Sequence, residues 1–282
     1  MNFHEVPNTY VDQIFLFVRN LQRSKDFYSG MLGLSILQQN QQAITFSANG
    51  TDPLLTVEQP VDVLPPNRRS AGLYHFAMLV PSRKDLAAVT AHLLKEDYPL
   101  VGGADHAVSE ALYLEDPDGN GIEIYRDRPA DEWKWENGKV LMLTEAMDEH
   151  LLDELNGEPW SGLPKETKMG HLHLQVANLK ETEKFYVEGL GFNLVAAYEP
   201  YADFISTGGY HHHLGLNVWN SRGVPVQEGI HVGLNYYRLV FPDIQMRHEA
   251  IDRLLKSGVS IEQTNERMFA KDPSGIKFEL GI

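Results

Sequence analysis

The sequence predicts an α+β fold built from four βαβββ units, arranged as two tandem copies of one domain. The first observation behind this prediction is an internal repeat, because segments 14–34 and 172–192 align without a gap and share the aromatic pair Phe-Tyr and a later Leu-Gly. The second is a strand pattern followed by a helix pattern, which occurs four times. The third is a D-P-x-G turn before the last strand of each copy. Repetition of this kind indicates a duplicated domain.

Each element of the repeat has a local reason. Alternating apolar residues indicate the first strand, and a helix ends at the glycine of "FYSGMLGL" or "FYVEGLGF". The strand–helix openings span 11–34, 73–98, 169–192 and 234–258. "DPDG" and "DPSG" suit type I turns between hairpin strands.

The boundaries follow from these elements. We expect a first domain over 9–127, with units at about 9–60 and 72–127, and a second over 169–282, with units at about 169–220 and 232–282. Residues 128–168 form a connector that is too long to be only a tether, and the stretch "EAMDEHLLDEL" within it predicts a helix.

Composition excludes several functions. The 282 residues carry a net charge of −15, with 24 basic against 39 acidic residues, and this balance argues against binding to nucleic acid or to an anionic membrane surface. No apolar run is long enough to span a bilayer, and the first residues do not resemble a signal peptide. We therefore expect a cytoplasmic protein. With no cysteine, any metal must be bound by His, Asp or Glu.

The order and repetition of "F-Y-x-x-x-L-G" and "D-P-x-G" resemble the vicinal oxygen chelate superfamily, over about 11–126 and 169–282. That family includes glyoxalase I, bleomycin-resistance proteins and type I extradiol ring-cleaving dioxygenases. The resemblance implies that pairs of units curl into cup-shaped mixed sheets with a divalent metal on the floor of a cup. The ligands would come from the start of the first strand and the end of the last strand of the units.

The family's ligand positions fall on residues that do not form a complete set within either copy. The first copy offers Gln13, His75 and Glu123, with Glu58 as a poorer match, and the second offers His171, Tyr236 and Glu279. The second and third units together supply His75, Glu123 and His171, the two-histidine, one-carboxylate set of non-haem iron(II) oxygenases. We therefore expect the inner units to pair and form the metal site. A competing arrangement within the second copy would use His171, His231 and Glu279.

Further polar residues follow from the same resemblance. Extradiol enzymes use a histidine near the end of the third unit as acid/base, and "YHHHLGLN" places His213 there; strand alternation would direct His213 into the cup and pack His212 beneath the strand. Tyr113 stands ten residues before Glu123, as the family pattern requires, and His106 resembles a further substrate-facing histidine. The remaining candidates for the substrate pocket are His173, His211 and Asn217.

The leading interpretation is an iron(II)-dependent extradiol dioxygenase of the catechol 2,3-dioxygenase kind. Its partners would be a small aromatic diol and dioxygen, and a homo-oligomer is compatible with the sequence. Mn(II), Ni(II) and Zn(II) are alternative metals. Two other functions remain open: a glyoxalase-type metal-dependent isomerase or lyase, and a metal-free small-molecule binding protein of the resistance kind.

Overall fold

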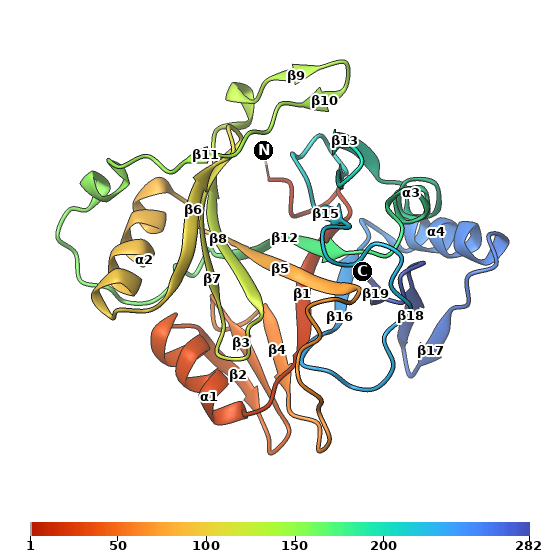
Figure 1. Cartoon of the computed structure of the whole chain (residues 1–282), viewed down its shortest axis with the longest axis horizontal. Helices are drawn as coiled ribbons and strands as arrows, with labels where there is room; N and C mark the ends of the chain where they lie inside the picture. The colour runs from red at the N-terminus through yellow and green to blue at the C-terminus, as the bar shows by residue number, and fades with distance from the viewer. Residues whose placement is uncertain (1) are drawn as a thin grey trace.

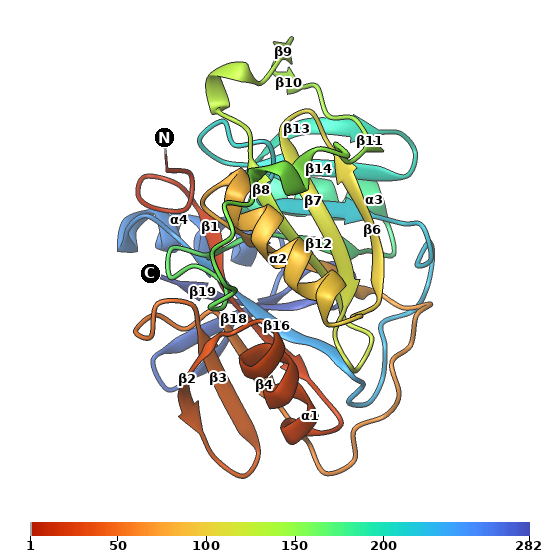
Figure 2. The same ribbon diagram turned by 90° about the vertical axis from the view of Figure 1, so that its left-hand side faces the viewer.

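The computed structural model describes residues 2–282, whose strands form two large cup-shaped sheets (Figures 1 and 2). The nine-stranded inner sheet has the order β11-β6-β7-β8-β5-β12-β15-β14-β13, and the eight-stranded outer sheet has the order β17-β18-β19-β16-β1-β4-β3-β2. In Figure 2 the inner sheet lies above the outer one. The α+β fold class expected from the sequence is confirmed.

The inner sheet combines the second and third units and one strand of the connector, β11. Its strands are β5 (Gly72–Leu79), β6 (Leu100–Asp105), β7 (Ser109–Glu115), β8 (Gly121–Asp127), β11 (Glu145–Ala146), β12 (Lys168–Gln175), β13 (Asn193–Tyr198), β14 (Ala202–Ser206) and β15 (Leu214–Asn217).

The outer sheet combines the first and fourth units. Its strands are β1 (Tyr10–Phe17), β2 (Ser35–Gln39), β3 (Ala43–Ser47), β4 (Leu55–Glu58), β16 (Gly233–Val240), β17 (Glu262–Thr264), β18 (Arg267–Lys271) and β19 (Lys277–Gly281).

Each unit also carries one helix, and in Figure 1 the first two helices lie on one side of the molecule and the last two on the other. They are α1 (Leu21–Lys25), continued by a π-helical segment over Asp26–Met31; α2 (Arg83–Lys95); α3 (Leu179–Lys184), continued by a π-helical segment over Phe185–Gly189; and α4 (Ile244–Lys256). No helix among residues 2–282 has both the length and the apolar character needed to cross a membrane.

The expected pairing of the inner units is confirmed by the strand registers. β5 runs antiparallel to β12 with His75 opposite His173, and β1 runs antiparallel to β16 with Tyr10 opposite Val240. Each sheet therefore joins one unit of the first copy to one unit of the second.

One face of each sheet packs into a shared hydrophobic core. Ile14 of β1, Phe76 of β5, Leu172 of β12 and Tyr237 of β16 are all fully buried in one cluster. Because side chains alternate along a strand, the residues between them point to the opposite faces, where the inner sheet presents its histidines.

The two repeated motifs contact each other, which gives their recurrence a structural reason. The hydroxyl of Tyr28 donates to Asp116 Oδ2 at 2.7 Å, and that of Tyr186 donates to Asp272 Oδ2 at 3.4 Å. Each aspartate opens a D-P-x-G turn, and its other carboxylate oxygen accepts backbone N–H groups of the turn. The tyrosine of one unit thereby holds the turn of the next.

The connector differs from the expectation of a helix over 145–155. β11 pairs with β6, and only Leu151–Glu154 forms a 3-10 turn. Arg83 of α2 binds Asp148 at 2.6 Å and Glu154 at 2.8 Å, so tertiary contacts override the helix propensity of the segment. The preceding part of the connector has a 3-10 turn over Ala130–Glu132 and a projecting hairpin of β9 (Trp135–Glu136) and β10 (Lys139–Val140) (Figure 2).

We predict that Tyr28→Phe weakens the fold, because it removes a hydrogen bond to a buried carboxyl group. The free energy of unfolding, measured by urea denaturation, should fall by about 1–3 kcal/mol. Tyr201→Phe is the matched control, since Tyr201 is more than half exposed. Equal effects of the two substitutions would contradict the role given to Tyr28.

Candidate functional site

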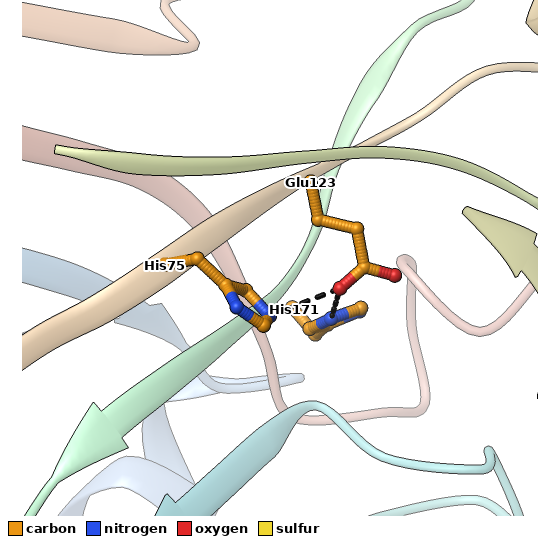
Figure 3. Close-up of side chains that lie close together, drawn as sticks. All are labelled: His75, Glu123 and His171. Atoms are coloured by element: carbon orange, nitrogen blue, oxygen red, sulfur yellow. Dashed lines mark hydrogen bonds and ion pairs between the residues drawn. The ribbon is translucent and has the colours of Figure 1, made fainter. Parts of the chain in front are cut away.

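Three side chains from three adjacent strands converge on the inner sheet (Figure 3). His75 comes from β5, Glu123 from β8 and His171 from β12. Glu123 Oε2 lies 2.9 Å from His75 Nε2 and 3.1 Å from His171 Nε2. One ligand atom from each residue can be chosen so that all three lie within 4.8 Å of one another.

The strand registers explain the convergence. Ala77 of β5 lies opposite Glu123 on one side and opposite His171 on the other. Its small side chain leaves space that the carboxylate and the imidazole fill from neighbouring strands. A break in the β5–β12 register between Met169 and His171 adjusts the position of the second histidine.

The electrostatics of this cluster favour the protonation state that metal ligands need. Burial alone would raise the pKa of Glu123, but His171 and His75 outweigh it and hold that pKa well below its usual range. Burial lowers the pKa of His171, against the opposing effect of Glu123. A metal binds carboxylate and neutral imidazole, the forms that these two pKa shifts favour at Glu123 and His171.

The hydrogen bonding of the cluster is incomplete without a cation. His75 Nε2 is buried and has no hydrogen-bond partner, because its close approach to Glu123 lacks the required direction. Buried polar atoms are normally satisfied. An ion shared by His75, Glu123 and His171 would satisfy this atom, so the donor set fits a divalent metal.

The competing set of His171, His231 and Glu279 does not form. His171 belongs to the inner sheet and Glu279 to the outer one. The Nδ1 of His231 bonds to the carbonyl of Pro65 at 2.8 Å in an exposed loop. That alternative is therefore wrong.

The outer cup contains an arginine at the place that corresponds to the metal cluster. Arg267 Nε donates to Glu279 at 2.9 Å, and its Nη2 donates to the hydroxyl of Tyr236 at 2.8 Å. The guanidinium also lies 5.0–5.5 Å from the ring centres of Phe15, Tyr236 and Phe269. Gln13, the remaining ligand position, bonds to Thr56. In the outer cup, the positive charge next to the glutamate is therefore the guanidinium of Arg267.

A cavity of about 610 Å³ opens from the cluster, and both His75 and Glu123 line it. The predicted residues Tyr113, His106 and His173 also line it. The sequence did not single out the aromatic residues of the wall, which are Tyr74, Tyr198, Tyr201, Phe204 and Trp219. Tyr74 and Phe204 lie within strands β5 and β14, Tyr198 ends β13, and Tyr201 and Trp219 lie in loops. They come from the second and third units, so only the pairing of these units brings them to one cavity.

Tyr113 and His106 form a hydrogen-bonded pair beside the cluster. His106 Nδ1 lies 2.6 Å from the carbonyl of Leu143, which can only accept, so Nδ1 carries the proton. In the neutral ring Nε2 then accepts from the hydroxyl of Tyr113 at 2.7 Å. Burial and the nearby Glu123 raise the pKa of Tyr113, so this hydroxyl keeps its proton.

The expectation that His213 faces the cavity is wrong. His213 is fully buried and does not line the cavity; its Nε2 donates to the carbonyl of Phe3, and its Nδ1 accepts from the backbone N–H of Thr207. Strand alternation fails as a guide because β15 begins only at Leu214, and residues 207–213 form turns and bends. Both ring nitrogens of His213 are already used.

His212, expected beneath the strand, lines the cavity instead. Its ring centre lies 4.1 Å from that of His171, and its Nδ1 lies 2.8 Å from His211 Nδ1. His211 does not line the cavity, because its Nε2 bonds to Asp127 Oδ1 at 2.8 Å. Since a carboxylate accepts, His211 Nε2 donates, and in the neutral pair His212 Nδ1 donates to His211. In this arrangement His212 Nε2 carries no proton and has no hydrogen-bond partner among residues 2–282.

Of the other residues expected in the substrate pocket, His173 lines the cavity and Asn217 does not. His173 lines the cavity with its Nε2 buried and unpaired. Gly215 makes room for it, because a Cβ there would lie 2.7 Å from the His173 ring. Asn217 lies outside the lining, is fully buried, and accepts from the backbone N–H of Trp219.

Comparison with known proteins places these features in context. A family model for the Glyoxalase/Bleomycin resistance protein/Dioxygenase superfamily matches residues 10–124 and 168–280. A catechol-2,3-dioxygenase of Bacillus subtilis (strain 168) is 42% identical over 276 residues, which cover 96% of this chain and 96% of that one.

Solved structures support the fold. Glyoxalase I from Zea mays superposes with a TM-score of 0.60 at 14% identity, over 96% of this chain and 92% of that one. The cppA protein from Streptococcus pneumoniae TIGR4 superposes with a TM-score of 0.59 at 11% identity, over 99% of both chains.

We predict that His75→Ala lowers the affinity for a divalent metal at least about a hundredfold, because it removes one of three ligands. Equilibrium dialysis followed by elemental analysis measures this. His231→Ala is the control and should bind metal like the unmodified protein, because its ring lies in an exposed loop. Retention of full metal affinity by His75→Ala would contradict the assignment of the cluster.

Proposed function

The chain belongs to the glyoxalase/bleomycin resistance protein/dioxygenase superfamily, and from this membership we propose that it is a metal-dependent extradiol dioxygenase acting on catechol-type diols. The observation that carries the proposal is the cluster of His75, Glu123 and His171, of which His75 and Glu123 line a cavity that also presents proton-handling groups. The name of the relative that is 42% identical supports the same reaction.

In this proposal His75, Glu123 and His171 hold iron(II), with Mn(II) as the alternative. Two imidazoles and one carboxylate are the ligand set of iron(II) oxygenases and leave coordination positions open. When bound, the metal supplies those positions and an exchangeable electron, which dioxygen chemistry requires. Both oxygen atoms of dioxygen enter the ring-opened product, so the reaction needs no external reductant.

We assign His212 as the group that takes a proton from the diol. Its Nε2 has no hydrogen-bond partner in the part of the chain that the structure describes. Asp127 accepts from His211 Nε2, and His211 Nδ1 accepts from His212 Nδ1, so the proton of the neutral His212 ring is on Nδ1. Burial lowers the pKa of His212 well below its usual value, and His171 and His211 lower it further. His212 is therefore neutral at neutral pH, so the lone pair on its Nε2 is available to accept a proton.

Tyr113 and His106 handle the other side of the substrate. The hydroxyl of Tyr113 can turn from His106 Nε2 toward a substrate oxygen and donate a hydrogen bond to it, and His106 holds the hydroxyl in place beforehand. His106 itself is held by the carbonyl of Leu143 in the connector. The connector thus positions a residue of the site.

The proposal predicts a direct assay. Protein loaded anaerobically with iron(II) should convert catechol and dioxygen into a yellow ring-opened semialdehyde, with equimolar dioxygen uptake followed by an oxygen electrode. Metal-stripped protein is the control and should be inactive. Absence of oxygen uptake with iron(II) and with Mn(II), or isomerisation of a methylglyoxal–thiol adduct without oxygen uptake, would reject ring cleavage.

His212→Phe should lower kcat by about 10²–10⁴-fold, the usual contribution of a positioned base, while the metal content stays unchanged. His213→Gln is the matched control, because both nitrogens of His213 are engaged away from the cavity. Its folded fraction should keep kcat within about tenfold. A larger decrease in kcat for His213→Gln than for His212→Phe would indicate that His213, and not His212, is the base.

A further inference from the structure

We propose that the outer part of the cavity is a subsite for an uncharged, apolar substituent on the diol ring, such as an alkyl or aryl group. This inference rests on the proposed function, since it assumes that the diol binds at His75 and Glu123. The substrate class is inferred from the cavity residues that lie between the metal cluster and solvent.

One wall of the subsite is a connected set of aromatic rings. The ring centre of His173 lies 5.3 Å from that of Tyr74, 5.2 Å from Trp219 and 5.5 Å from Phe204. Tyr74 and Trp219 also contact each other edge to face, with centres 5.0 Å apart. The wall therefore extends without interruption from the metal cluster outward.

The aromatic wall reaches the mouth of the cavity. Tyr74 and Trp219 are 41% and 46% exposed, and Tyr201 is 56% exposed. Exposed aromatic side chains that line one opening indicate a surface on which an apolar ligand group can pack. A substituent directed away from the metal end would cover these rings.

Another part of the lining is aliphatic. Val101 of β6 and Met142 and Leu143 of the connector line the same cavity. Val101 is 71% exposed and Leu143 39% exposed, so apolar surface continues to solvent on this side as well. A substituent in this part of the cavity would have both aromatic and aliphatic side chains available for contact.

The charges in the lining exclude an anionic substituent. Among the residues described, the lining contains no lysine or arginine but two glutamates, Glu115 and Glu123. Arg68 lies outside the lining, where it pairs with Glu115 at 3.2 Å. A carboxylate on the ring would find no lysine or arginine in the lining to bind, which disfavours its desolvation.

The size of the cavity agrees with a substituted ring. Clefts of about 300–1,000 Å³ enclose drug-sized ligands, and this one measures about 610 Å³. A single unsubstituted catechol ring would leave most of the apolar surface in contact with water.

The test compares three diols with iron(II)-loaded protein: catechol, 2,3-dihydroxybiphenyl and 3,4-dihydroxyphenylacetate. The value of kcat/KM should be about ten- to a hundredfold higher for the biphenyl than for catechol, as expected from burial of one phenyl group. It should be at least about tenfold lower for the carboxylate. Anaerobic calorimetry gives Kd values for the same diols without turnover, and these should follow the same order.

Two variants locate the subsite. Trp219→Ala should reduce the ratio of biphenyl to catechol kcat/KM at least about fivefold, whereas Trp135→Ala, a similarly exposed tryptophan on the projecting hairpin, should change it less than about twofold. Val101→Arg should raise kcat/KM for the carboxylate relative to catechol, and Val61→Arg, outside the cavity, should not.

Each result decides one of the two proposals. Cleavage of all three diols with equal efficiency, or preference for the carboxylate, would overturn the subsite and leave ring cleavage standing. If no diol is cleaved, ring cleavage fails, and the calorimetric Kd values alone decide the subsite: tighter binding of the biphenyl supports it, and equal values overturn it.

Discussion

The antiparallel pairing of β5 with β12 is the constraint on which the functional site depends. β5 belongs to the first sequence copy and β12 to the second, and their register places His75 opposite His173 and His171 opposite Ala77. Neither copy contains both histidine ligands. The metal cluster, the row of imidazoles beside it and the cavity above them all exist because two half-sites from different copies share one sheet.

The two cups show two solutions to one electrostatic problem, a buried glutamate on the last strand of a unit. In the outer cup Arg267 compensates Glu279 permanently. In the inner cup Glu123 is compensated by histidines, which can be neutral and so leave the carboxylate available to an exchangeable cation. A buried carboxylate needs a partner in either case, and the choice of partner separates a structural cup from one able to do chemistry.

The sequence predicted the fold class and the pairing of the inner units. The order of the repeats and the residue types at the ligand positions can be recognised without knowing the backbone structure. It brought His75, Glu123 and His171 together correctly in space. It failed at the histidine triplet, since alternation applies only inside a strand and β15 starts after His213. Burial of His213 by Phe3 depends on an N-terminal segment more than two hundred residues away, and the helix expected over 145–155 is lost to contacts with Arg83. Long-range contacts of this kind leave no local pattern.

The pairing of β1 with β16 has a consequence for how the chain reaches this state. β1 lies far before β16 in the sequence, so Tyr10 pairs with Val240 only when β16 is available, and β19 then pairs with β16 in the same sheet. Contacts so distant in sequence slow folding. The first unit pairs its own strands β1, β4, β3 and β2, but the outer sheet is complete only after the fourth unit joins β1 through β16.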